Sequence, residues 1–199
     1  MKKKIRTSNK TIAVIGEGIT EKYYLNSLSD FIRVNIVPKL PKHTSMAQLE
    51  KSIKECTVLG YDSVYVLIDM DNKKEGKNRF DYYKLKNKYN QTTKNKCYIE
   101  FFENERCIEM WFLYHFKCTT KEYRESNDIV RELNTLCGYD KTEKFFIKSG
   151  GLHDFLCDHG GNFEKALRNA NKSMISKEKD GRNCTYSEMH KFFKSVPRK

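Results

Sequence analysis

The 199-residue sequence predicts an α/β protein with a parallel sheet flanked by helices and a C-terminal helical extension. Two β-rich apolar runs, residues 12–15 and 64–68, stop abruptly at acidic residues, as buried parallel strands do where they emerge at a sheet edge. Extended and helical segments alternate through the first half of the chain with short connections. The second half has a helical pattern that Gly150-Gly151 and Gly160-Gly161 interrupt.

The expected strands cover residues 11–16, 32–37, 63–69 and 97–102. Between them the pattern predicts helices over 19–30 and 44–59, and a loop and helix over 71–91. Further helical stretches are expected near 105–116, 121–137, 151–158, 161–179 and 185–194. We therefore expect a basic N-terminal tail (1–10), an α/β domain (11–116) and a helical extension packed on it (117–199).

Composition limits the partners and the compartment. The net charge is +12, which concerns binding partners and not the fold. No stretch has the length and apolar character of a signal peptide or a membrane span. The seven cysteines are dispersed without a C-x-x-C pair, which indicates reduced thiols and a cytoplasmic protein.

Four carboxylates follow the two apolar runs, at the sheet edge where open α/β sheets bind ligands. Asp69 and Asp71 are two residues apart and point the same way in an extended chain, whereas Glu17 and Glu21 stack on one face if a helix begins near Gly18. Crowded carboxylates repel unless a cation lies between them, and hard oxygen ligands select Mg²⁺ or Mn²⁺. The alternative is that the aspartates only form a turn or cap a helix.

A dinucleotide-binding turn is a competing interpretation of Gly16-Glu17-Gly18, because a strand precedes it and a helix follows. The third glycine of that motif would fall on Glu21. The next expected strand ends in Pro38-Lys39 and not in an acidic ribose ligand. Both departures argue against this interpretation.

Glu109 is the one carboxylate inside the strongly apolar run 108–115. A buried carboxylate is costly without a partner, so Glu109 needs a cation, a metal or a raised pKa. Glu105 precedes it by one helical turn and could share its face. Pairing of Glu109 with an arginine such as Arg106 is the structural alternative.

His153, Cys157 and His159 form a second cluster of metal-ligand types. A zinc site needs a fourth ligand and usually recurring spacings, which the chain does not supply. The sequence also lacks the G-x-S-x-G, H-E-x-x-H and G-x-x-x-x-G-K-[ST] motifs. It therefore gives no support for a triad hydrolase, a zincin or an ATPase with a nucleotide loop.

The segment 72–96 carries nine Lys or Arg against two acids, interleaved with aromatic residues. Such a stretch can neutralise phosphates while its rings stack on bases. A solvated lysine-rich helix with its aromatics in the core is the alternative. The position beside Asp69 favours a polyanionic substrate. The expected nucleic-acid-binding residues are Lys73, Lys74, Lys77 and Arg79.

These strand ends are similar to the Toprim signature: Glu17-Gly18 with Thr20-Glu21, then Asp69-Met70-Asp71. Toprim is the metal-dependent catalytic fold of topoisomerases, bacterial primases and overcoming-lysogenization-defect nucleases. The resemblance implies a Toprim-like, Rossmann-like sheet and a catalytic role for the domain over 11–116.

A later stretch, 105–116, resembles the Cys-hydrophobic-Glu-hydrophobic-Trp…His-Phe stretch of RloB-like proteins, which are bacterial phage-defence components related to abortive-infection systems. The family often begins it with Asn-Pro-Cys, whereas here Glu105-Arg106 precedes Cys107. Tyr139-Asp-Lys141 and residues 183–190 match the helical half of the family weakly. The similarity spans roughly residues 10 to 195.

The resemblance implies an effector nuclease that works with a partner ATPase of AAA or ABC type, encoded in the same defence operon. Related Toprim effectors attack nucleic acid, transfer RNA in some systems, to halt growth during infection. RNA is the expected substrate. The resemblance leaves open whether DNA is also cut and whether the protein forms a homodimer. No membrane partner is expected.

The expected chemistry is phosphodiester hydrolysis with Mg²⁺ or Mn²⁺. Glu17 is a ligand or a general acid/base, and Lys141 neutralises charge in the transition state. The alternatives are a non-catalytic module that binds nucleic acid or a partner, strand transfer by a tyrosine, and phosphoryl transfer or phosphatase action on small substrates. The expected metal ligands are Glu21, Asp69, Asp71 and Glu109.

Overall fold

The computed structural model describes residues 10–33, 35–39, 45–71, 73, 76–181 and 183–198. Its strands are β1 (Thr11–Ile15), β2 (Asn35–Lys39), β3 (Ser63–Asp69), β4 (Thr92–Lys94) and β5 (Cys97–Asn104). Its helices in the first half are α1 (Ile19–Asn26), α2 (Met46–Val58) and α3 (Gly76–Tyr89). The second half contains α4 (Glu109–Tyr114), α5 (Ser126–Cys137), α6 (Glu143–Lys148), α7 (Leu152–Asp158), α8 (Phe163–Asp180) and α9 (Met189–Ser195).

The five strands form one sheet in the order β2-β1-β3-β5-β4. The pairs β1–β2, β1–β3 and β3–β5 are parallel, and only the short edge strand β4 is antiparallel. The other edge strand, β2, contains Pro38, which an edge tolerates because its missing N–H removes no bond from the sheet interior. The predicted α/β class with a mostly parallel sheet is confirmed.

Alternate residues of each central strand enter two separate cores. Ala13, Val66 and Phe101 pack with α2 and α3 on one face. Val14 and Leu67 belong to a larger core on the other face, which continues through α1 and α9 into α4, α5 and α8. The central strands are therefore buried on both sides, which explains their continuous apolar runs.

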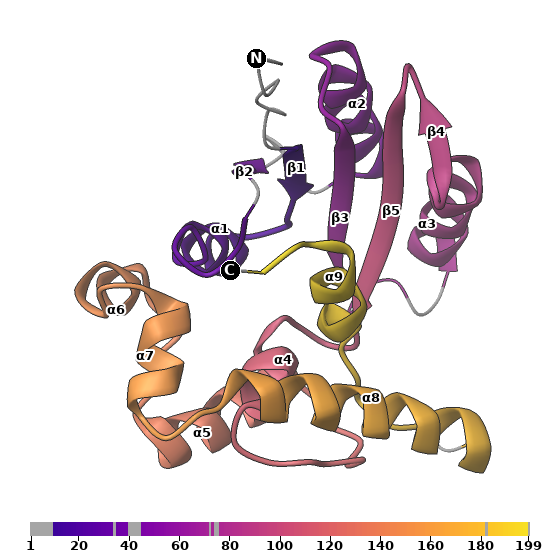
Figure 1. The fold of residues 1–199 in the computed structure, drawn as a ribbon. Helices are drawn as coiled ribbons and strands as arrows, with labels where there is room; N and C mark the ends of the chain where they lie inside the picture. The colour runs from indigo at the N-terminus through magenta and orange to yellow at the C-terminus, as the bar shows by residue number, and fades with distance from the viewer. Residues whose placement is uncertain are drawn as a thin grey trace, which may run out of the picture.

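The helical half lies beyond the sheet at the end where β1 and the strands parallel to it finish (Figure 1). The long helix α8 crosses this end in front of α4, and α9 returns to lie against β3 and β5. The large core includes side chains from both halves, such as Val14, Trp111 and Ala166. The predicted C-terminal helical part is thus present and shares its core with the sheet.

Two elements escaped the sequence prediction. The three-residue strand β4 has no apolar alternation, and it turns into β5 through Asn95 and Lys96, both with positive φ (51° and 66°). Helix α6 has only six residues and is capped by Thr142, whose hydroxyl accepts the Phe145 N–H. Elements this short carry too few residues to show a period.

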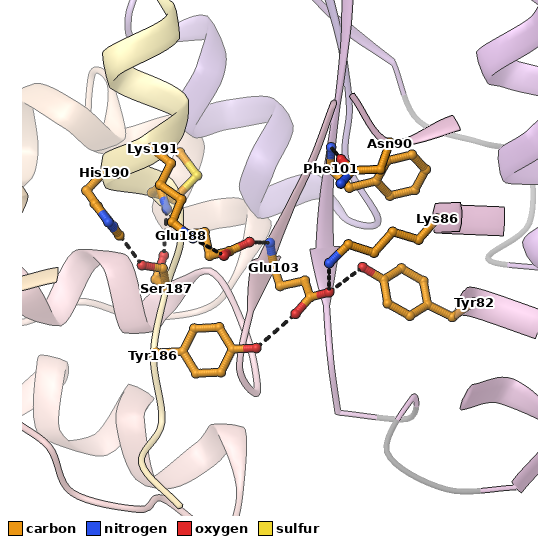
Figure 2. Close-up of polar contacts among 11 residues, drawn as sticks. Tyr82, Lys86, Asn90, Phe101, Glu103, Tyr186, Ser187, Glu188, His190 and Lys191 are labelled. Atoms are coloured by element: carbon orange, nitrogen blue, oxygen red, sulfur yellow. Dashed lines mark hydrogen bonds and ion pairs between the residues drawn. The ribbon is translucent and has the colours of Figure 1, made fainter. Parts of the chain in front are cut away.

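A closing segment, residues 184–188, ties the end of the chain to β5. Glu103 Oε1 accepts bonds from Tyr82 (2.7 Å) and Lys86 (2.5 Å) of α3, and Oε2 accepts one from Tyr186 (2.9 Å), as Figure 2 shows. The Glu103 N–H donates to Glu188 at 2.9 Å. One buried carboxylate therefore fixes α3 and the closing segment relative to each other.

Candidate active site

The turn between β1 and α1 positions Glu21. Gly16 has no room for a side chain, because its Cβ would lie 2.7 Å from the Cβ of Glu21. The Gly18 N–H donates to Glu21 Oε2 at 3.1 Å in the first turn of α1. Glu21 is only 2% exposed. The glycines thus allow a buried carboxylate to sit against the carboxyl end of β1.

Glu17 and Asp69 meet because β1 and β3 are parallel neighbours. The Asp69 N–H donates to Glu17 Oε2 at 3.3 Å. The ammonium group of Lys73 lies 2.8 Å from Glu17 Oε1 and donates to the Asp69 carbonyl oxygen at 2.6 Å. Lys73 is 7% exposed, so it is the counter-ion of Glu17. This corrects the expectation of a surface cation at Lys73.

Glu109 comes from the helical half and is completely buried. Tyr139 donates to its Oε1 at 2.9 Å, and the Lys141 ammonium lies 3.0 Å from Oε1 and 3.1 Å from Oε2. Arg106 instead binds the Tyr123 carbonyl oxygen at 2.9 Å, so the arginine alternative for Glu109 is wrong. The cation beside Glu109 is Lys141.

Glu105 does not share a helical face with Glu109. Arg106 has φ of +71°, which interrupts the expected helix, and α4 begins only at Glu109. The Glu105 N–H donates to the Tyr186 carbonyl oxygen at 2.8 Å. Glu105 therefore belongs to the contact between β5 and the closing segment.

Glu17, Glu21, Asp69 and Glu109 form what we call the carboxylate cluster. Burial, followed by the charges of Glu109 and Glu17, raises the pKa of Glu21 to about 7, although a hydrogen bond from the backbone N–H of Glu21 and the charge of Lys141 oppose the rise. Burial, together with the charges of the other three carboxylates, raises the pKa of Asp69 well above its usual range. These interactions place all four carboxylates within electrostatic reach of one another, although Glu109 is distant in sequence.

The cluster has the donor chemistry of a divalent cation site. All its ligand atoms are carboxylate oxygens, and Asp69 Oδ1 is buried and receives no hydrogen bond within the described residues. In the described part of the chain, however, no group of three or more Asp, Glu, His or Cys is arranged so that it could hold a metal ion. Lys73 and Lys141 already neutralise Glu17 and Glu109. Binding of a metal therefore requires rearrangement of these side chains.

Asp71 lies apart from the other expected ligands. Strand β3 ends at Asp69 and the chain turns, so the extended alternation that would align the two aspartates does not reach Asp71. Its carboxylate accepts a bond from the Ser126 hydroxyl at 2.5 Å and lies 3.9 Å from Arg106. The expectation that Asp69 and Asp71 point together is wrong in this conformation.

The basic segment divides between surface and core. Lys77 and Arg79 are exposed on α3, whereas Lys74 lies outside the described residues. Among the rings, Phe80 and Tyr83 are exposed. Tyr82 and Tyr89 pack in the core, as the structural alternative required. The exposed part that could meet a polyanion is thus smaller than the sequence suggested.

The histidines His153 and His159, in and just after α7, do not form a zinc site with Cys157. His159 bonds the Phe155 carbonyl oxygen at 2.8 Å on the surface. His153 is buried against Phe31, with ring centroids 4.6 Å apart. No metal-binding group includes them within the described ranges.

Sequence reasoning missed two partners of the cluster. Lys73 follows Asp69 by four residues, and this short spacing after a strand end was the available signal. Tyr139 stands two residues before Lys141, in a stretch singled out only by resemblance. Both side chains act through contacts distant in sequence, which a linear pattern does not contain.

A model of the family described as RloB-like protein matches residues 12–196. That range includes the whole carboxylate cluster, Lys73 and Lys141. Comparison with curated protein sequences gave no match, and comparison with solved structures gave none. Because the family match covers nearly the entire chain, the protein belongs to the RloB-like family.

Proposed function

We propose that this RloB-like protein is a Mg²⁺- or Mn²⁺-dependent nuclease that hydrolyses phosphodiester bonds at the carboxylate cluster. One observation carries the proposal: four carboxylates from three separated segments converge at the carboxyl ends of parallel strands, with raised pKa values at Glu21 and Asp69. Buried acids that repel one another destabilise a fold, so their convergence favours a functional role. Sites at this end of an α/β sheet commonly bind ligands.

In the proposed site, Asp69, Glu21 and Glu109 would hold the cation, and Asp71 would join them if it left Ser126. A bound Mg²⁺ or Mn²⁺ would polarise the scissile phosphate and lower the pKa of a bound water. Glu17 acts as a further ligand or as a general acid/base, depending on whether Lys73 stays bound to it.

Lys141 contacts Glu109 and is 40% exposed, so its ammonium can also face a phosphate. Burial lowers the pKa of Lys141, but the nearby charges, that of Glu109 first and that of Asp69 among the others, have the larger effect and raise this pKa. Lys141 therefore stays protonated. A fixed positive charge at this position would stabilise negative charge that develops on the phosphate oxygens.

The proposed substrate is nucleic acid, with RNA and in particular transfer RNA preferred by the family resemblance. The proposed setting is a phage-defence system in which an ATPase of AAA or ABC type controls the nuclease. The exposed Lys77 and Arg79 are suited to contacts with phosphates near the site.

Cleavage assays test the nuclease directly. Purified protein is incubated with labelled transfer RNA, single-stranded RNA, and single- and double-stranded DNA, in Mg²⁺, Mn²⁺ or EDTA. We expect cleavage of at least one substrate with either metal and none in EDTA. Glu17→Ala should abolish it, whereas the exposed Glu178→Ala on α8 should not. Binding without cleavage, unchanged by loss of the acids, would favour the non-catalytic module.

Expression in bacteria tests the effector role. Wild type and Glu17→Ala are produced with and without the neighbouring ATPase, and growth and nucleic-acid integrity are followed. We expect growth arrest and new fragments only with intact Glu17. Equal toxicity of Glu17→Ala, or arrest without fragments, would contradict the proposed mechanism.

A further inference from the structure

A pocket of about 450 Å³ opens beside the carboxylate cluster. Met70 and Lys73 are among its lining residues; Met70 follows Asp69 in the chain, and Lys73 is paired with Glu17. Tyr83 and Arg79 of α3 line one wall, and residues 183–186 line another. The volume falls in the range of small-molecule sites, which is about 300–1,000 Å³.

The walls of this pocket are fixed by the contacts of Glu103. Tyr186 reaches Glu103 from one side, while Tyr82 and Lys86 reach it from α3 (Figure 2). Tyr83 follows Tyr82 directly on α3, and its ring is 40% exposed. The pocket is therefore built on rigid elements and presents an aromatic ring to solvent.

Two cationic groups stand over the rings of the pocket. The Arg79 guanidinium lies 5.8 Å from the centroid of the Tyr83 ring. The Lys177 ammonium of α8 lies 3.9 Å from the centroid of the Tyr186 ring. Aromatic faces with adjacent cations bind nucleic-acid bases by stacking and phosphates by charge.

The pocket also contains the carboxylates of Glu105 and Glu122. Their charge disfavours a phosphate directly beside them. The same oxygens accept hydrogen bonds from the amino and ring N–H groups of a base. The lining therefore offers acceptors to a base, through Glu105 and Glu122, and cations to its phosphates, through Arg79 and Lys177.

We propose that this pocket binds one unpaired nucleotide of the substrate strand, next to the phosphodiester bond placed at the carboxylate cluster. This inference rests on the proposed nuclease function and adds a preference for single-stranded or unpaired nucleic acid. A base held in a duplex is stacked and paired, so it must first be unstacked and unpaired to enter the pocket.

Binding in EDTA tests the pocket separately from cleavage. The probe is a fluorescein-labelled oligoadenylate of about ten nucleotides, a length typical of single-strand sites, alone or annealed to its complement. We expect the single strand to bind at least tenfold more tightly than the duplex. If the protein binds in this way but never cleaves, the proposed function fails and the pocket assignment stands.

Matched variants locate the binding. Base stacking contributes about 1–3 kcal/mol, so Tyr83→Leu should weaken single-strand binding about tenfold, whereas Tyr83→Phe keeps the ring and the affinity. Lys177→Ala should weaken it, and the exposed Lys172→Ala on the same helix should not. AMP should compete only weakly. Unchanged binding by Tyr83→Leu, equal binding of duplex, or tighter binding of AMP than of the strand would each overturn the proposal.

Discussion

The carboxylate cluster and a buried histidine pair both remove titratable side chains from water, but the surroundings of these side chains differ. His115 and His153 lie in the helical half, with ring centroids 6.3 Å apart. Trp111 and Phe163 pack around them. Both ring nitrogens of His115 and Nδ1 of His153 receive no hydrogen bond in the described structure. The two regions thus both bury titratable groups with unsatisfied polar atoms.

They differ in what surrounds the titratable groups. Lys73 and Lys141 contact the carboxylates, and a pocket adjoins them. The histidines are enclosed by aromatic rings, and burial lowers the pKa of His115 to about 3, so it stays neutral. A buried group beside counter-ions and an open pocket is suited to bind a charged ligand, whereas a neutral group in an aromatic enclosure is part of the core.

The largest expected effect separates Asp69 from Asp71. Asp69→Asn removes one carboxylate ligand of the proposed cation, so we expect cleavage to fall about 10²–10³-fold, as on loss of one electrostatic group that stabilises a transition state. Asp71→Asn should have a smaller effect, because Asp71 is bound to Ser126. Initial cleavage rates in Mg²⁺, with folding checked by circular dichroism, measure both. Full activity of Asp69→Asn would mean that the carboxylate cluster, like the histidine pair, takes no part in catalysis.

The pH dependence of stability gives the next effect. The pKa of Glu21 rises from 4.5 to about 7 on folding, so the folded state retains a proton that the unfolded state loses. Its stabilising contribution is full below pH 4.5 and disappears as pH rises through 7. Without divalent cations, Glu21→Gln should therefore be more stable than wild type at pH 8, by about 3 kcal/mol.

Thermal melts from pH 4 to 9 in EDTA measure this difference, with the exposed Glu178→Gln as the control. Mg²⁺ should raise the melting temperature of wild type more than that of Glu21→Gln. The reason is that the wild-type cluster has one more carboxylate for the cation to bind and neutralise. Parallel pH profiles of the two proteins would contradict the burial of a strained carboxylate at this position.

The histidine pair should respond in the opposite sense. His115 stays neutral when folded, so the unfolded state gains a proton below pH 6.5 that the folded state does not bind until about pH 3. Stability is thus present above pH 6.5 and falls as pH decreases, by about 2 kcal/mol at pH 5. His115→Leu should reduce this acid sensitivity and leave cleavage unchanged. Urea unfolding at pH 5 and 7 tests it, with the exposed His159→Leu as the control.

The smallest effect concerns exposed charges outside both regions. Replacing Lys77 and Arg79 by Ala should weaken nucleic-acid binding several-fold and reduce the slope of log affinity against log salt by about 1–2. Turnover at saturating substrate should change less. Affinity titrations at several salt concentrations measure the slope. An unchanged slope would mean that these side chains are only solvated.

The strand ends were predictable because each depends on a local pattern. The runs before Glu17 and Asp69 are apolar, and the parallel pairing that brings them together follows from the fold class. Glu109 could also be identified from the sequence, because it is the one carboxylate within an apolar run. The bonds from Lys73, Lys141 and Tyr139 were not predictable as geometry, since they depend on side-chain directions after tertiary packing.

The interruption of the expected helix at Arg106 shows a second limit of prediction from the sequence. The run after Glu105 has helical character, but a positive φ at a residue other than glycine depends on contacts from elsewhere. Here the Tyr123 carbonyl oxygen binds the Arg106 side chain. The pocket escaped prediction for the same reason, because Tyr83 is distant in sequence from Lys177 and Tyr186, which line the pocket with it.

The closing segment has a consequence for synthesis on the ribosome. Glu103 and its partner Tyr186 are separated by 83 residues, and translation releases them in that order. Strand β5 and α3 therefore leave the ribosome well before the residues that complete the pocket wall. On the proposed function, a polypeptide whose translation stops before residue 186 would lack this wall. Such a fragment would keep the carboxylate cluster, so it would lose the nucleotide pocket and not the proposed metal ligands.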